Sequence, residues 1–421
     1  MNEHSVSVNG ISIYSLTNPN LRSFCLSLYV RAGSIFEDLS NNGISHLFEH
    51  VVFRNIKNKY ENFYELLAMH GLCFQGSTYK KFVSFTIDGP QHEFDFAIEI
   101  LCGLFDEIKL TSHDFNNEKG RIKAEIREKD RRSSLDFYFD SVVWKNSEVE
   151  KIVLGYCKTI DRVSVKRINE FRQKVLSAGN CFVYATGNIS DENLDALNKK
   201  ISELDISQSN PGFTNTVTVN NEFFHREKKI WIKNNYWHYI QIGFDVDCSK
   251  YPGGVYDLLY ALLFNGDKAL VYNYLSEDNP IIYSYDSTFE QYDNVGNINF
   301  SFEVDRNKIE DVFKTIVELL NAAKDGRFNF EANLNYEMFN WELDLDKPSN
   351  LNWNMAYYNH ILKTEPIDYS DEFYGRFRVT KKQVTDAAKD IFRRCNMTVA
   401  MMGNKKKINT DAIEKILESL D

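Results

Sequence analysis

The amino-acid sequence predicts an α+β protein made of two homologous halves, each a mainly antiparallel sheet with helices packed on one face. The first observation is an internal repeat, in which residues 162–188 match residues 378–404 without a gap, at a constant offset of 216 residues. The second is that period-2 strand patterns alternate with helical stretches along the whole chain. The third is a polar segment between the repeats. We therefore expect one half at 1–206, a linker at 207–226 and the second half at 227–421.

The two halves show the same order of elements when their hydrophobic patterns are followed along the chain. The first half is predicted to contain a strand at 24–30, a helix around 46–50, a strand at 82–88, and helices at 92–108 and 114–130. The second half is predicted to contain a strand at 237–246, a helix at 254–264, a strand at 297–304, and a helix at 307–324.

Each copy of the repeat predicts a capped helix, a strand and a second helix. Ser164 in one copy and Thr380 in the other are N-cap residues ahead of an amphipathic stretch. A short apolar strand follows and ends in a Gly-Asn turn, at Gly187-Asn188 and at Gly403-Asn404. The match between residues 162–188 and 378–404, each near the end of its half, is the main reason to expect two halves of similar fold.

Composition excludes several classes of protein. A net charge of −11 argues against a nucleic-acid binder, which would be basic, and is compatible with a cationic or neutral peptide substrate. No signal peptide and no apolar run long enough to cross a membrane are visible, so we expect no membrane span. The seven cysteines are widely spaced and form no CxxC pair, which is typical of reduced thiols and predicts a cytoplasmic location.

The segment His46-Leu47-Phe48-Glu49-His50 is the strongest chemical motif. Residues four apart lie on one face of a helix, so both imidazoles can bind one metal ion. Glu49 lies beside that face, where a carboxylate can take a proton from water activated by the metal. The alternative is an ordinary helix with two solvated or capping histidines.

A catalytic zinc site needs a third protein ligand. Glu118 and Glu125 are seven residues apart, so they lie on one face of the helix predicted at 114–130. One of these carboxylates could complete a His-His-Glu site, and the other could orient a histidine or the water. The alternative, favoured by this segment alone, is a solvated face whose glutamates form surface pairs with basic neighbours such as Arg121.

Taken together, these motifs resemble the zinc-peptidase family of pitrilysin, insulin-degrading enzyme and the mitochondrial processing peptidase, in its short processing-peptidase-like subfamily. The segment at 31–55 is similar to the zinc-binding block of that family, and the Glu-x6-Glu spacing matches its downstream helix. The resemblance implies an α+β fold of two halves and the following roles: zinc ligands His46, His50 and Glu125, catalytic base Glu49, and supporting carboxylate Glu118.

The resemblance also indicates where a peptide would bind, and where this chain departs from the family. The family holds its substrate on a strand edge with the sequence N-A-x-T, which here is Gln75-Gly76-Ser77-Thr78, so these four residues are the candidate substrate-binding residues. The family also carries an arginine and a tyrosine that polarise the substrate carbonyl. Tyr283 occupies the tyrosine position and is a candidate catalytic residue, but Ser276 stands where the arginine is expected.

This departure predicts a partner. A homologous subunit without a metal could supply the arginine and tyrosine, so the sequence predicts a heterodimer that encloses a chamber for the peptide. A homodimer that uses another cation, such as Arg306 or Lys268, is the alternative, and so is a weak or inactive enzyme.

The predicted function is therefore a zinc-dependent endopeptidase that cuts short or unfolded peptides, for example leader or precursor peptides, as the catalytic subunit of that heterodimer. The alternative function is a non-catalytic structural subunit of the same family. A redox or nucleotide-dependent enzyme is not supported, since neither GxGxxG nor GxxxxGK[ST] nor CxxC occurs.

Overall fold

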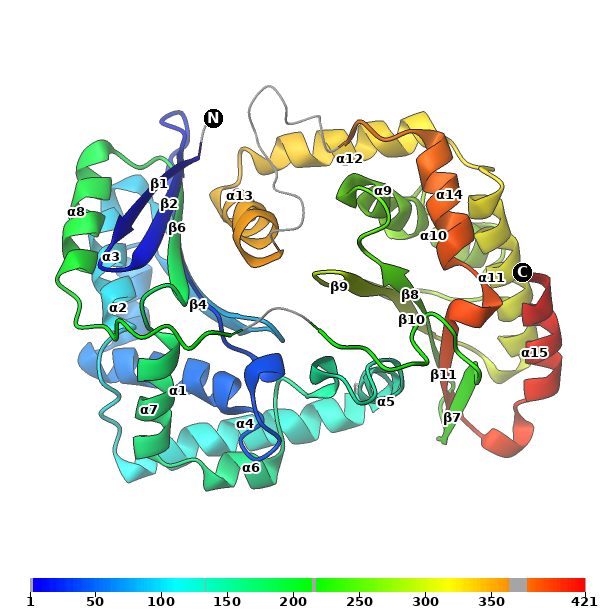
Figure 1. Ribbon diagram of the computed structural model, residues 1–421, viewed down its shortest axis with the longest axis horizontal. Helices are drawn as coiled ribbons and strands as arrows, with labels where there is room; N and C mark the ends of the chain where they lie inside the picture. The colour runs from blue at the N-terminus through cyan, green and yellow to red at the C-terminus, as the bar shows by residue number, and fades with distance from the viewer. Residues whose placement is uncertain (1–2, 133, 214–216, 363–376, 421) are drawn as a thin grey trace.

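The computed structural model describes residues 3–132, 134–213, 217–362 and 377–420. It contains two β-sheets at opposite sides of the molecule, and each sheet is covered on its outer face by helices (Figure 1). This arrangement confirms the predicted α+β class with two similar halves.

The first sheet has six strands in the order β1-β2-β6-β3-β5-β4. All neighbours are antiparallel except β2 and β6, which are parallel. The strands are β1 (His4–Val8), β2 (Ile11–Thr17), β3 (Ser23–Val30), β4 (Cys73–Thr78), β5 (Val83–Pro90) and β6 (Cys181–Gly187). Strand β4 therefore lies at one edge of the sheet and pairs only with β5.

The second sheet has five strands in the order β7-β11-β8-β10-β9, and only β7 and β11 are parallel. These strands are β7 (Ile230–Asn234), β8 (Tyr239–Asp247), β9 (Asp286–Tyr292), β10 (Val295–Glu303) and β11 (Met397–Gly403). The order of the last four mirrors β6-β3-β5-β4 of the first sheet, so the two sheets share one topology.

The repeat seen in the sequence is also a repeat in register. Val30 pairs with Cys181 in the first sheet, and Phe244 pairs with Met397 in the second. Cys181 and Met397 are equivalent positions of the repeat. The two predicted caps are present as well, since the hydroxyl oxygens of Ser164 and Thr380 each accept a hydrogen bond from the backbone N–H three residues later.

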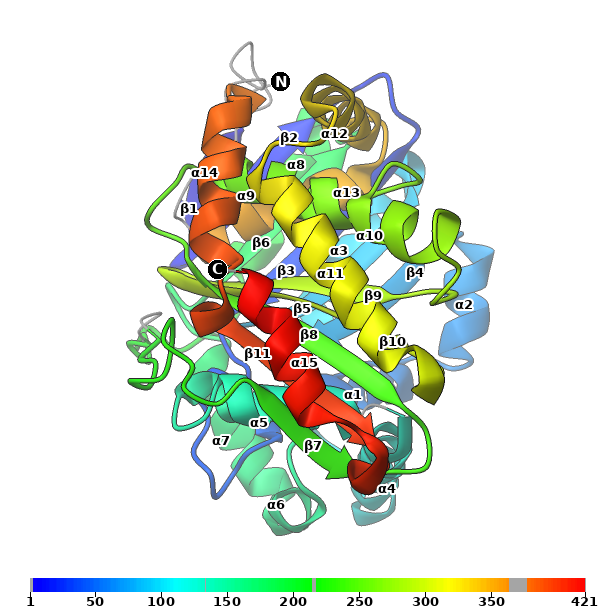
Figure 2. The same cartoon turned by 90° about the vertical axis from the view of Figure 1, so that its right-hand side faces the viewer.

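Each half has its own hydrophobic core between its sheet and its outer helices. The helices of the first half are α1 (Ile44–Lys59), α2 (Phe63–Met69), α3 (Phe94–Gly103), α4 (Ser112–Arg132), α5 (Ser134–Val143), α6 (Cys157–Arg162), α7 (Val165–Val175) and α8 (Asp191–Ser202). Those of the second half are α9 (Gly253–Phe264), α10 (Leu270–Tyr272), α11 (Ile309–Lys324), α12 (Phe330–Asp344), α13 (Pro348–Met355), α14 (Lys381–Ile391) and α15 (Thr410–Leu417). Figure 2 shows α11, α14 and α15 in front of the second sheet.

Two helices cross from one half to the other, which the sequence analysis did not predict. Helix α13 of the second half packs on β3 and β6 of the first sheet, and α5 of the first half packs on β8 and β11 of the second. Asn352 on α13 accepts a hydrogen bond from the hydroxyl of Tyr29 at 2.9 Å and donates to the carbonyl oxygen of Tyr184 at 2.9 Å. Each half therefore covers part of the inner face of the other.

A buried ion pair fixes the end of the linker beside this crossing. Arg226 and Asp245 are both fully buried, and the Nε and Nη2 atoms of Arg226 donate to the two carboxylate oxygens at 2.9 and 2.8 Å. Nη2 of Arg226 also donates to the carbonyl oxygen of Val143 at the end of α5, at 3.1 Å. One side chain thus joins the linker, the second sheet and a helix of the first half.

Four strands were not predicted from the sequence, and one helix is shorter than predicted. Strands β1, β2, β7 and β9 were not predicted; β1 and β7 are only five residues long, whereas β2 has an alternating apolar pattern that could have indicated a strand. The helix expected at 92–108 ends at Gly103. The backbone groups that follow form hydrogen bonds with side chains of α7 instead of continuing the helix. Arg172 donates to the carbonyl oxygen of Phe105, and the side-chain oxygen of Asn169 accepts from the N–H of Ile108. No helix in the described part of the chain is long and apolar enough to span a membrane.

Candidate metal centre

Helix α1 carries both histidines, and a buried carboxylate holds its first turn. Glu37 accepts hydrogen bonds from the backbone N–H groups of Gly43 and Ser45 at 2.7 and 2.8 Å, and from the side chain of Asn42 at 2.8 Å. Gly43 precedes the helix with a φ of 94°, a left-handed conformation that suits glycine. A negative charge at a helix N-terminus is stabilising, so Glu37 fixes the position of the motif helix.

His46, His50 and Glu125 converge on one point between α1 and α4. The Nε2 atoms of His46 and His50 lie 3.6 and 3.9 Å from Oε2 of Glu125, and one ligand atom from each residue lies within 4.8 Å of the others. Within the described residues, this is the only such group of three or more His, Cys, Asp or Glu side chains.

This cluster fits a zinc ion. A tetrahedral zinc with bonds of about 2.1 Å separates its ligand atoms by about 3.4 Å, close to the observed spacing. The two imidazoles lie within ion-pair distance of Glu125, at 3.6 and 3.9 Å, which is longer than an ordinary hydrogen bond. Two imidazole nitrogens and a carboxylate oxygen are also one of the donor sets found in catalytic zinc sites.

Glu49 lies beside the cluster and is held by Thr78. The hydroxyl of Thr78 donates to Oε2 of Glu49 at 2.6 Å. Burial, which is the largest effect, raises the pKa of Glu49, and the charge of Glu125 adds to it, while the hydrogen bond from Thr78 and the charge of His50 oppose it. A carboxyl with a raised pKa is a better proton acceptor and donor near neutral pH.

Glu118 lies behind His50 and is almost fully buried. Its carboxylate is 2.8 Å from Nε of Arg54, 3.5 Å from Nη1 of Arg121 and 3.6 Å from Nδ1 of His50. Burial alone would raise the pKa of Glu118, but the contact with His50 and the charges of Arg121 and Arg54 outweigh it, so the pKa is lowered. The carboxylate therefore stays charged and orients the ring of His50.

The four candidate substrate-binding residues, Gln75 to Thr78, make up most of the edge strand β4 beside α1. Gly76 leaves room for its neighbours, since a Cβ atom there would lie 2.5 Å from the ring of Phe53 and 2.9 Å from Cγ of Glu49. The alanine that the related family has at this position would not fit here without moving one of them. Thr78 directs its side chain to Glu49, and a role of this strand in binding a peptide stays a prediction.

A depression of about 380 Å³ lies next to the cluster. It is lined by Glu49, His50, Phe53, Arg54, Lys57, Tyr64, Phe74, Gln75, Gly76, Glu118 and Arg121. All of these residues belong to the first half. No described residue of the second half therefore lines this depression.

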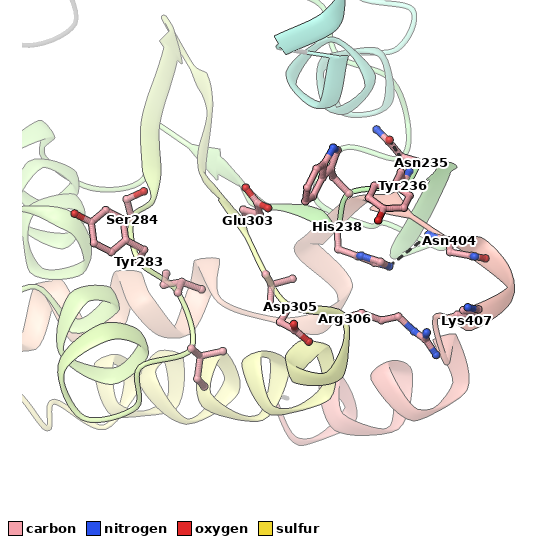
Figure 3. A pocket seen from close by; sticks show the side chains of 14 residues that line it. Asn235, Tyr236, His238, Tyr283, Ser284, Glu303, Asp305, Arg306, Asn404 and Lys407 are labelled. Atoms are coloured by element: carbon pink, nitrogen blue, oxygen red, sulfur yellow. Dashed lines mark hydrogen bonds between the residues drawn. The ribbon is translucent and has the colours of Figure 1, made fainter.

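Tyr283 and Ser276 lie in the second half, away from this depression. Ser276 lies in a π-helical turn at Asn273–Glu277, and Tyr283 is 97% exposed. Figure 3 shows a second depression, of about 710 Å³, in which Tyr283 lies at one end while Arg306 and Lys407 lie together at the other. Lys268 contacts α12 instead, where its ammonium donates to Asn333 at 2.8 Å. Neither alternative cation lies beside Tyr283.

Two residues of the candidate metal centre, Arg54 and Glu37, were not predicted from the sequence. Arg54 follows His50 by one helical turn, so the spacing of 46, 50 and 54 on α1 could have indicated it. Glu37 was harder to predict from the sequence, because it precedes α1 by seven residues. Its carboxylate contacts the N-terminus of α1 only because the intervening loop folds back.

Comparisons with known proteins show which family the chain is similar to. Two family models match consecutive parts of the chain, one described as "Insulinase (Peptidase family M16)" at residues 13–155 and one described as "Peptidase M16 inactive domain" at 162–332. The uncharacterized zinc protease YmxG of Bacillus subtilis is 21% identical over 324 residues, which are 75% of this chain and 77% of that protein.

Two more similarities come from yeast and from a solved structure. The beta subunit of the mitochondrial-processing peptidase of Saccharomyces cerevisiae is 23% identical over 190 residues, or 44% of this chain. That alignment spans 41% of the yeast subunit, which is less than half of its length. A protease from Helicobacter pylori has the same fold, with a TM-score of 0.83 over 96% of this chain and 99% of that one, at 18% identity.

Proposed function

The chain belongs to peptidase family M16, and we propose that it is the zinc-bearing catalytic subunit of an endopeptidase that cuts short or unfolded peptides. The convergence of His46, His50 and Glu125 beside a half-buried Glu49 carries this proposal. Membership of a family whose named relatives include zinc proteases supports it.

In the proposed mechanism, zinc would be held by His46, His50 and Glu125, and when bound it supplies a Lewis acid that activates water and polarises the scissile carbonyl. Glu49 accepts the proton of the attacking water and later gives it to the leaving amine. Thr78 holds the carboxylate of Glu49 in place for both transfers. Glu118 holds the ring of His50, and the N–H and C=O groups of the β4 edge are available to a peptide strand.

A homologous partner subunit is part of the proposal. The carbonyl oxygen that becomes negative during hydrolysis needs donors from the protein. In this chain Ser276 stands at the expected arginine position, and every described residue that lines the depression beside the metal cluster belongs to the first half. Tyr283 is almost fully exposed, which suits a role at an interface with another chain. We therefore propose a heterodimer whose second, metal-free subunit supplies an arginine and a tyrosine.

Co-expression tests the partner. A homologue of similar length that carries the arginine and tyrosine but no His-x-x-Glu-His motif should co-purify with this chain and increase cleavage of a peptide by at least about tenfold. Full activity of the isolated chain would overturn the heterodimer and leave the peptidase in place. The cytoplasmic location stays a prediction, which cell fractionation would test.

A non-catalytic subunit is the second candidate, and one observation favours it. Residues 162–332, which include much of the second half, match a model described as an inactive domain, and Ser276 stands in place of the arginine. Elemental analysis separates the candidates, because a structural subunit does not require zinc, whereas the peptidase requires about one zinc per chain.

A further inference from the structure

The depression beside the metal cluster has an aromatic floor. The rings of Phe53 and Phe74 stack with centroids 4.3 Å apart and an angle of 21° between their planes. Tyr64 stands at the margin with 61% of its surface exposed. A volume of about 380 Å³ is within the range of small ligand pockets, so the floor can receive a large apolar side chain.

The rim of the same depression is cationic. Arg54, Lys57 and Arg121 line it, whereas Glu49 and Glu118 are the acidic lining residues. Glu118 is buried and already lies within ion-pair distance of both arginines, and Lys57 rests over the ring of Tyr64 at 4.8 Å. Three cations thus face two carboxylates, one of which is buried beneath the surface.

No other carboxylate among the described residues is within ion-pair distance of the outward-facing cations. The side chain of Arg121 is 60% exposed and forms an ion pair with Glu118. Among the described residues, no further carboxylate lies within 4 Å of the Arg121 guanidinium, and none lies within 4 Å of the Lys57 ammonium. Asp114, which is close enough to Arg54 to sense its charge, is held by the hydroxyl of Thr111 at 2.7 Å. Lys57 and Arg121 can therefore bind an acidic group of a ligand.

We propose that the substrate of this site is an acidic peptide, in which a large apolar or aromatic residue beside the scissile bond has an aspartate or glutamate as a near neighbour. The inference rests on the proposed function and adds the substrate class to it. The apolar side chain would lie on Phe53 and Phe74, and the carboxylate would pair with Lys57 and Arg121. The net charge of −11 would by itself favour a cationic or neutral peptide, but the local charge at the depression is of the opposite sign.

The test is a binding measurement with the full chain. Zinc-loaded Glu49→Gln protein is titrated into three labelled peptides with a central phenylalanine flanked by aspartate, asparagine or lysine, and fluorescence anisotropy is recorded. The aspartate peptide should bind about tenfold or more tightly than the lysine peptide, and this ratio should fall toward one at about 1 M salt. Cleavage of the same peptides by the wild-type chain, with its partner if one is required, is measured in parallel.

A charge reversal on the rim gives a second readout. Lys57→Glu should reduce the preference for the aspartate peptide by about threefold to tenfold. Lys59→Glu is the matched control, because Lys59 lies two residues away on the same helix, pairs with Asp106 at 2.9 Å and is not part of the depression. The control should leave the preference within about twofold of the wild type.

The outcomes separate this inference from the proposed function. Equal affinity and equal cleavage rate for the aspartate and lysine peptides would overturn the acidic-peptide inference alone. A preference for the aspartate peptide that is unchanged in Lys57→Glu would do the same. A chain that holds zinc, but neither binds nor cuts any of the three peptides, would overturn the peptidase and the inference together.

Discussion

Removal of the charge of Glu118 is predicted to weaken zinc binding without removing a ligand. In Glu118→Gln the side chain keeps its shape and one carbonyl acceptor, but it loses the negative charge beside Arg54 and His50. Nδ1 of His50 lies 3.6 Å from this carboxylate, so the ring loses the group that orients it. Loss of such a supporting carboxylate costs about 10-fold to 100-fold in metal affinity, or about 1.4–2.7 kcal/mol.

The protein contacts support a similar magnitude. Nε of Arg54 lies 2.8 Å from Oε1 of Glu118 in a largely buried ion pair, and leaving one partner of such a pair poorly compensated costs about 1–3 kcal/mol. We therefore expect the zinc dissociation constant to rise between about 10-fold and 100-fold, measured by competition with a chromogenic chelator. The exposed Glu128 on the same helix provides the control, Glu128→Gln. A change below about twofold in Glu118→Gln would refute the supporting role.

Three further predictions concern the strand edge, the junction of the halves and pH. Gly76→Ala should lower peptide cleavage and leave zinc content unchanged, because the new Cβ atom would lie 2.9 Å from Cγ of Glu49; unchanged turnover would contradict this. Arg226→Ala should lower the free energy of unfolding in urea by about 3–5 kcal/mol, since it leaves the buried carboxylate of Asp245 without its counter-ion; a loss below about 1 kcal/mol would contradict it. Burial raises the pKa of Glu290 from 4.5 to about 7, so the folded state holds this proton more tightly than the unfolded state does. The contribution of Glu290 to stability is therefore greatest at acidic pH and is lost as pH rises from about 4.5 to about 7, and Glu290→Gln should remove this part of the pH dependence in denaturant titrations.

Local patterns in the sequence were sufficient to predict much of the fold and to identify His46 and His50 as candidate metal ligands. His46 and His50 lie on one face because of helix geometry alone. The internal repeat indicated that the two halves share one topology. Glu125 was less certain, because its helix also fits a solvated face. Its approach to the histidines depends on how α4 packs against α1, and no local pattern encodes that packing.

Other features depend on contacts between distant segments and could not be read from local patterns. The exchange of α5 and α13 between the halves depends on which apolar faces meet after both sheets have formed. The need for glycine at position 76 becomes visible only when Phe53 and Glu49 lie against it. The cationic rim was hidden for a similar reason, since the total charge of −11 says nothing about the charge at one place on the surface.

We propose that Glu49 is the proton-transfer residue of a zinc peptidase. This proposal is tested most directly by the rate of peptide hydrolysis in zinc-loaded Glu49→Gln protein, assayed beside the wild type and with the partner subunit if one is required. We expect about one zinc per chain in both proteins, cleavage by the wild type, and a rate for the variant that is lower by at least about a hundredfold. Turnover by the zinc-loaded variant at the wild-type rate would contradict it.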